Sequence, residues 1–78
     1  MTDGGYVVQG GNKHGGYWGK GETLEDAERE ALKHAFGTDE EKQAGILGRY
    51  STDDLESAQL IEDADGYRIL ARGLQQIS

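Results

Sequence analysis

Residues 23–37 are TLEDAEREALKHAFG, and this run predicts the main helix of the chain. Thr23 stands ahead of two acids, which is typical of a helix start. The hydroxyl accepts a hydrogen bond from an otherwise unpaired N–H, and acids are favoured at the positive end of the helix dipole. We expect a helix over about residues 24–36, ended by Gly37.

One side of this predicted helix is apolar. The members of this stripe recur at helical spacing and are Leu24, Ala27, Ala31, Leu32, Ala35 and Phe36. Glu28 falls within the stripe, so it must reach the edge of the stripe or find a partner. An apolar stripe of this width predicts a helix that packs on a sheet.

The strands of that sheet are predicted from short β-prone runs. Tyr6–Gln9 and Tyr17–Trp18 flank glycines and Asn12, a pattern that favours an N-terminal hairpin. Ile46–Tyr50 is typical of a central strand.

The C-terminal third predicts a second hairpin. Its strands span about Ala58–Ile61 and Tyr67–Ala71, joined by a turn over residues 63–66, and residues 51–54 form a loop before it. Residues 55–60 also suit a helical turn, so both interpretations stay open there.

Between the main helix and the central strand, Thr38 precedes a second run of acids and predicts one or two helical turns through about Ala44. Together these elements predict an α+β fold. A small antiparallel sheet, made of the N-terminal hairpin, the central strand and the C-terminal hairpin, packs against one main helix. Seventy-eight residues have room for one core, so residues 1–78 form a single domain.

Several functional classes find no support in the residues. The chain has no cysteine, and no run approaches the ~20 apolar residues that span a bilayer, so a cytoplasmic location is expected. Glu30 and His34 share a helix face but are too few to hold zinc, and the acids near Gly66 lack the ligands of a calcium loop. No nucleophile motif is present. We expect no enzyme activity, no metal and no cofactor.

Glycines crowd residues 10–21, where they make up six of the thirteen in the chain. A phosphate-binding loop is not matched, because Gly19-Lys20 is followed by Gly21 rather than by Ser or Thr. Turn geometry is the favoured explanation of this tract, and contact with a ligand is the alternative.

The chain carries 15 acidic and 8 basic side chains, for a formal charge of −7. This charge disfavours direct binding to nucleic acid or to an anionic membrane and favours a basic protein partner. The candidate contacts are Tyr17 and Trp18 as anchors, with Glu40, Glu41, Asp53 and Asp54 as partners of Arg or Lys. Helix capping, solubility and halophilic adaptation explain the same acids without a partner.

Residues 16–27, GYWGKGETLEDA, resemble the strand that leads into a capped helix in many very small phage proteins. In size, acidity and element order the chain is similar to the anti-CRISPR inhibitors. The resemblance implies an inhibitor that docks on a nucleic-acid-binding surface of a CRISPR effector complex, in the cytoplasm of the host cell.

The first functional hypothesis is therefore a protein-binding inhibitor that competes with nucleic acid. The competing hypothesis is a small structural or housekeeping protein, either a monomer or a homodimer formed through an exposed strand edge, whose acidity provides only solubility.

Overall fold

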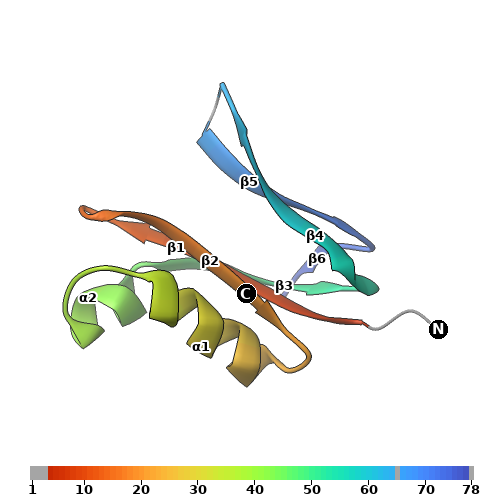
Figure 1. The fold of residues 1–78 in the computed structure, drawn as a ribbon, viewed down its shortest axis with the longest axis horizontal. Coiled ribbons are helices and arrows are strands. Elements are labelled where there is room, and N and C mark those ends of the chain that lie inside the picture. The colour runs from red at the N-terminus through yellow and green to blue at the C-terminus, as the bar shows by residue number, and fades with distance from the viewer. Residues whose placement is uncertain (1–3, 65, 78) are drawn as a thin grey trace.

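The computed structural model describes residues 4–64 and 66–77, and over these it has six strands and two helices (Figure 1). In chain order they are β1 (Gly5–Asn12), β2 (Gly15–Gly21), α1 (Leu24–His34), α2 (Asp39–Ala44), β3 (Ile46–Thr52), β4 (Asp54–Asp63), β5 (Gly66–Arg72) and β6 (Gln75–Gln76). All pairings are antiparallel. The predicted α+β class, with one main helix, is confirmed.

Three layers make up the molecule. A four-stranded sheet has the order β2-β1-β3-β6. In Figure 1, α1 lies on one face of this sheet, and the β4–β5 hairpin projects from the other. The hairpin forms a two-stranded sheet of its own. The sequence did not predict this separation.

The central strand β1 explains the three layers, because both of its faces are buried. Val8 packs with Ala27 and Ala31 of α1, whereas its neighbour Val7 packs with Ala58 and Ile69 of the hairpin. Successive residues of a strand point to opposite faces. The two valines therefore anchor two separate small cores, and both are fully buried.

Helix α1 begins as predicted. The Thr23 side chain accepts a hydrogen bond from the Asp26 N–H at 3.1 Å. The helix ends at His34, two residues before the predicted boundary, and Phe36 is 68% exposed. The prediction that Phe36 belongs to the buried stripe is therefore wrong, because the chain has left the helix before it.

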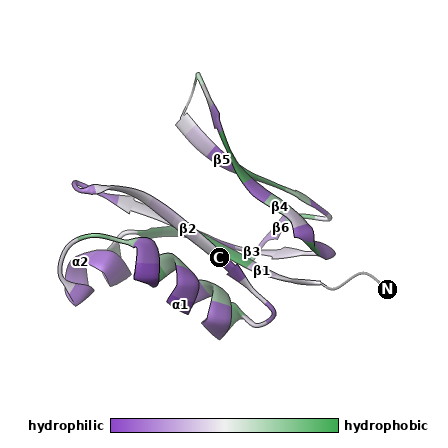
Figure 2. Cartoon of the chain, viewed as in Figure 1, coloured by the Kyte–Doolittle hydropathy of each residue, from purple (hydrophilic) through white to green (hydrophobic). Residues whose placement is uncertain are grey.

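The stripe otherwise packs on the sheet as expected. Ala27, Ala31 and Ala35 are buried, and Leu24 and Leu32 are half-buried. Figure 2 shows the matching amphipathic pattern, with hydrophilic and hydrophobic residues alternating around α1.

The helix sits unusually close to the sheet because β2 carries glycines beneath it. A Cβ atom on Gly19 would lie 2.2 Å from the Ala31 nitrogen, and one on Gly21 would lie 2.8 Å from the Ala27 nitrogen. Both distances are shorter than any real contact, so only glycine fits. Most of the glycine tract is therefore strand rather than turn, and the two-residue turn consists of Lys13 and His14.

Residues 51–60 differ from the prediction. Ser51 and Thr52 extend β3, only Asp53 separates β3 from β4, and no helical turn forms. The pairing of β4 with β5 is irregular between Asp54 and Gln59, which explains why this stretch lacks a clean strand pattern. Asp65 of the predicted 63–66 turn lies outside the described residues.

Candidate binding cleft

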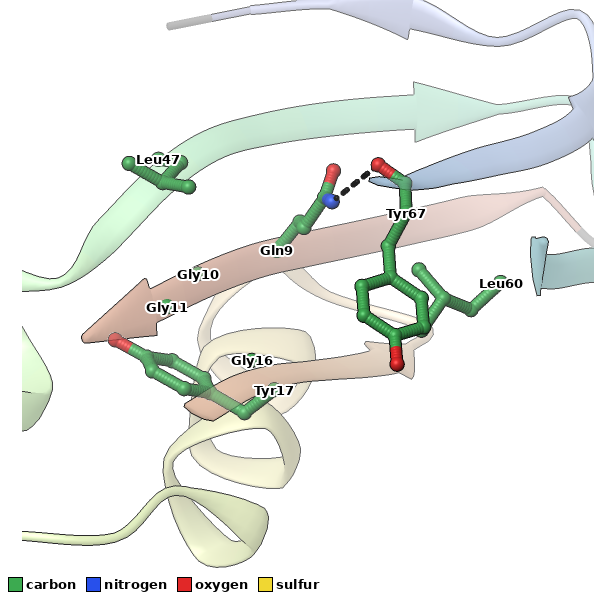
Figure 3. Close-up of a pocket in the computed structure, with 8 residues that line it drawn as sticks. All are labelled: Gln9, Gly10, Gly11, Gly16, Tyr17, Leu47, Leu60 and Tyr67. Atoms are coloured by element: carbon green, nitrogen blue, oxygen red, sulfur yellow. Dashed lines mark hydrogen bonds between the residues drawn. The ribbon is translucent and has the colours of Figure 1, made fainter. Parts of the chain in front are cut away.

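An open cleft lies between the sheet and the overhanging β4–β5 hairpin, on the face opposite α1. Its volume is about 380 Å³, and it is lined by Gln9, Gly10, Gly11, Gly16, Tyr17, Leu47, Leu60 and Tyr67 (Figure 3). These residues come from five strands. The cleft therefore exists only once the hairpin has crossed the sheet.

The floor of the cleft is bare backbone. Gly11 of β1 pairs with Gly16 of β2, and both lie in the same alternation as Val7 and Trp18, which face the hairpin side. A Cβ atom on Gly11 would meet nothing closer than 3.7 Å, and one on Gly16 nothing closer than 3.8 Å. A Cβ atom at either position therefore has room, and it would point into the cleft.

The walls of the cleft are apolar and exposed. Leu47 of β3 is 73% exposed and Tyr67 of β5 is 56% exposed, while Leu60 of β4 is half-buried. Gln9 holds the hairpin above the sheet, because its Nε2 donates a hydrogen bond to the Tyr67 carbonyl at 3.3 Å (Figure 3). Convergent apolar side chains around an open concavity are typical of a binding site.

The base of the hairpin is held by Lys20, which extends from β2 to the irregular part of β4. Its Nζ donates to the carbonyls of Leu55 at 3.2 Å and Ala58 at 3.4 Å. The Thr52 hydroxyl donates to the Arg72 carbonyl at 2.6 Å. These bonds fix the position of the hairpin relative to the sheet, and so they fix the width of the cleft.

Glu28, which lies within the apolar stripe of α1, has the partner that its position required. Arg49 of β3 donates from Nε at 3.2 Å and from the NH2 nitrogen at 2.6 Å to Glu28 Oε1. Both side chains are about one-third exposed. The pair ties α1 to β3 at the edge of the helix-side core.

The two predicted aromatic anchors belong largely to the core. Tyr17 is only 4% exposed, and its hydroxyl donates to the Lys42 carbonyl in α2. Burial raises the pKa of this hydroxyl. Trp18 is half-buried against the hairpin-side core. The Tyr17 ring fills the space that Gly10 leaves on the helix side, so little of this predicted anchor is exposed for contact with a partner.

The four predicted acidic contacts divide into two groups. Glu40 and Glu41 belong to α2, whereas Asp53 and Asp54 lie where β3 meets β4, and Figure 1 places these segments at opposite ends of the molecule. Glu40 and Asp53 are exposed. The structure does not bring the four acids into one patch.

Glu41 and Asp54 already have structural roles. Glu41 Oε1 accepts from the Thr38 N–H at 3.1 Å, and its Oε2 lies 3.3 Å from His14 Nε2 and 3.6 Å from Lys13 Nζ. The hydrogen bond from the Thr38 backbone lowers the pKa of this carboxyl. Asp54 Oδ1 accepts from the Glu56 N–H.

Sequence reasoning missed the cleft walls Leu47, Leu60 and Tyr67. Nothing in the sequence marks them, because their convergence depends on the hairpin crossing the sheet. The glycine floor of the cleft has a sequence signal that the walls lack. A hairpin with its turn at Lys13 and His14 places Gly11 opposite Gly16.

Within residues 4–64 and 66–77, no three or more acidic or histidine side chains gather as metal ligands would. None of the described helices has the length and apolar character needed to cross a bilayer. Comparison with protein-family models, with curated proteins and with solved structures found no match.

Proposed function

We propose that this protein is a non-enzymatic binding module whose cleft receives an apolar side chain of a partner protein. The observation that carries this proposal is the glycine floor. Gly11 and Gly16 have no positive φ, and a Cβ atom at either position has room. Interior glycines weaken a strand and often mark a close approach by a ligand. Since neither turn geometry nor packing requires glycine here, an open cleft is the explanation we favour.

The chemistry of the lining also supports binding rather than catalysis. The lining residues carry no carboxylate, imidazole, amine or aliphatic hydroxyl, which are the groups that most often move protons or attack substrates. Of the two tyrosine hydroxyls, that of Tyr17 is engaged with the Lys42 carbonyl. The cleft offers apolar area and backbone, which recognise shape.

A charge of −7 favours a partner with a basic surface. Exposed acids at both ends of the molecule, Glu40 and Asp53, would orient such a partner across the cleft. A partner that uses its basic surface for nucleic acid would then be inhibited, as in the finer proposal of an anti-CRISPR protein acting on a CRISPR effector complex. Small size, net charge and the order of the elements support this finer proposal.

A pull-down from the natural host supplies the partner, and calorimetry then tests the site. Gly11→Val fills the cleft with a good strand former, so the melting temperature should stay close to that of the parent protein. We expect its affinity for the partner to fall by about tenfold or more. Unchanged affinity in the folded variant would remove the cleft from the proposal.

The charge part of the proposal has its own variant. The double substitution Glu40→Lys and Asp53→Lys should weaken binding at low salt and lose this effect as salt rises, since exposed charges contribute only about 0–1 kcal/mol per pair to folding. Glu41 and Asp54 are left intact because they stabilise local structure. A protein that captures no partner and is a dimer by light scattering would favour the structural homodimer instead.

A further inference from the structure

Strand β2 is an edge of the four-stranded sheet, and none of the described elements pairs with its outer side. The direction of its backbone groups follows from the register. The Gly11 N–H donates to the Gly45 carbonyl, away from β2. Since bonding directions alternate along an antiparallel pair, Gly10 and Asn12 bond to β2 through their partners Tyr17 and Gly15.

It follows that the backbone N–H and C=O groups of Gly16, Trp18 and Lys20 point outward. No strand among residues 4–64 and 66–77 pairs with these groups, so they form a row of available donors and acceptors along the edge. Such a row is a template for another strand.

The usual protections of an edge strand are missing here. The chain has no proline, the β1–β2 register has no irregularity, and four of the seven residues of β2 are glycines. The one charged side chain of the strand, Lys20, is drawn back to the β4 carbonyls. The edge is therefore open, whereas native edges are normally blocked by bulges, prolines or lysines.

A second copy of this chain does not fit the edge. Gly19 touches the backbone of Ala31, so α1 lies directly over β2. Pairing two β2 strands antiparallel would place both α1 helices on the same face, above strands that are only about 4.8 Å apart. Packed helices need about 8–10 Å between their axes. An extended segment without a helix above it meets no such obstacle.

The side chains on the two sides of the edge differ in character. The indole of Trp18 lies on the hairpin side and is half-buried. On the helix side, Glu30 is half-buried and has no hydrogen bond or ion pair with the described residues. It lines a depression of about 220 Å³ together with His34, Trp18, Gly19 and Lys20. A strand at this edge would place alternate side chains against the carboxylate of Glu30 and against the indole of Trp18.

We propose that the outer edge of β2 binds an extended segment of a partner protein as an added strand, in which basic residues toward α1 alternate with apolar residues toward Trp18. This inference rests on the proposed protein-binding function and names the kind of segment that is bound. Backbone hydrogen bonds supply affinity in strand addition, and the alternating side chains supply specificity.

The probe is the peptide acetyl-KVKVKVK-amide, titrated into the ¹⁵N-labelled protein. We expect slowed hydrogen exchange at the Gly16 and Trp18 amides and a measurable affinity below about 1 mM. The same composition in block order, KKKKVVV, should bind about tenfold more weakly, as should EVEVEVE. An absence of protection at these two amides at about 1 mM peptide would refute the added strand.

Two N-methylated forms of the peptide test the backbone directly. Methylating the N–H groups that face β2 removes the hydrogen bonds, whereas methylating the alternate set leaves them intact. Methylation of the N–H groups that face β2 should weaken binding by about tenfold or more. Methylation of the alternate N–H groups should weaken it by less than about twofold. Equal effects of the two sets would overturn the proposal.

The protein-side variant is Gly16→Pro, which removes an outward donor that β1 does not use. A variant whose α1 amide spectrum is unchanged should bind the peptide about tenfold more weakly, whereas Gly16→Ala, which also points into the cleft but keeps its N–H, should bind it as the parent protein does. The variant Gly11→Val distinguishes binding at the edge from binding in the cleft. If the peptide instead shifts the NMR signals of Leu47 and Tyr67, and Gly11→Val no longer binds it, the edge proposal fails while the cleft proposal stands.

Discussion

The closeness of α1 to β2 yields the sharpest prediction, the substitution Gly19→Ala. The new Cβ would lie 2.2 Å from the Ala31 nitrogen and 2.6 Å from the Glu30 carbonyl carbon, whereas ordinary contacts begin at 3.4 Å. The helix backbone would have to move by about 1.2 Å. Backbone cannot rotate out of the way as a side chain can, so the whole helix must lift from the sheet.

Overpacking typically costs about 1–3 kcal/mol, and a backbone clash belongs at the upper end of that range. Seventy-eight residues imply a total stability of about 4–12 kcal/mol at 0.05–0.15 kcal/mol per residue. A loss of about 3 kcal/mol would lower the melting temperature by about 12–24 °C in a domain of this size.

Thermal unfolding followed by circular dichroism measures this loss, and the matched control is Gly16→Ala. Gly16 lies on the same strand, but its Cβ would meet nothing within 3.8 Å. We expect this control to stay within about 1 kcal/mol of the parent protein in either direction. If the two alanine variants melt within a few degrees of each other, then α1 does not lie on β2 as described.

Three further predictions concern the bonds between layers. Arg49→Met should cost about 1–2 kcal/mol in urea unfolding by leaving the Glu28 carboxylate half-buried without its partner, and adding Glu28→Met should recover part of that loss. Lys20→Met should speed hydrogen exchange in β4 and β5 while the α1 amides stay protected, since Lys20 holds the hairpin by two carbonyls. The lowered pKa of Glu41 means that its contribution to stability is present above the ordinary glutamate pKa, about 4.3, and is lost as the pH falls through the lower folded value. NMR of the α2 amides should therefore show fraying in the parent protein only once the pH has fallen below the ordinary glutamate pKa, and no such transition in Glu41→Gln.

Local signals predicted the helices best. Thr23 and Thr38 accept the hydrogen bonds that their positions in the sequence indicated. The need of Glu28 for a partner also followed from helical periodicity alone. Each of these inferences depends on residues within one or two turns of each other, and such short-range chemistry is the same in any fold.

The glycine tract shows where local reasoning fails. Turn chemistry explains glycine when φ is positive, and in this tract only Gly15 has a positive φ. Gly19 and Gly21 are required by a helix that arrives later in the chain. Gly11 and Gly16, which the packing does not require, face the cleft instead. The same residue type thus serves three purposes, and the sequence alone could not separate them.

By itself, the sequence determined the α+β class, the start of both helices and the antiparallel hairpins, because caps, periodicity and turns act over a few residues. Only the tertiary structure decided that β4 and β5 leave the main sheet, that Tyr17 is buried, and that Leu47 and Tyr67 converge over bare glycine backbone. These features depend on how a hairpin near one end of the chain crosses a sheet formed largely near the other. Contacts between residues so distant in sequence follow from packing as a whole, which leaves no local pattern to read.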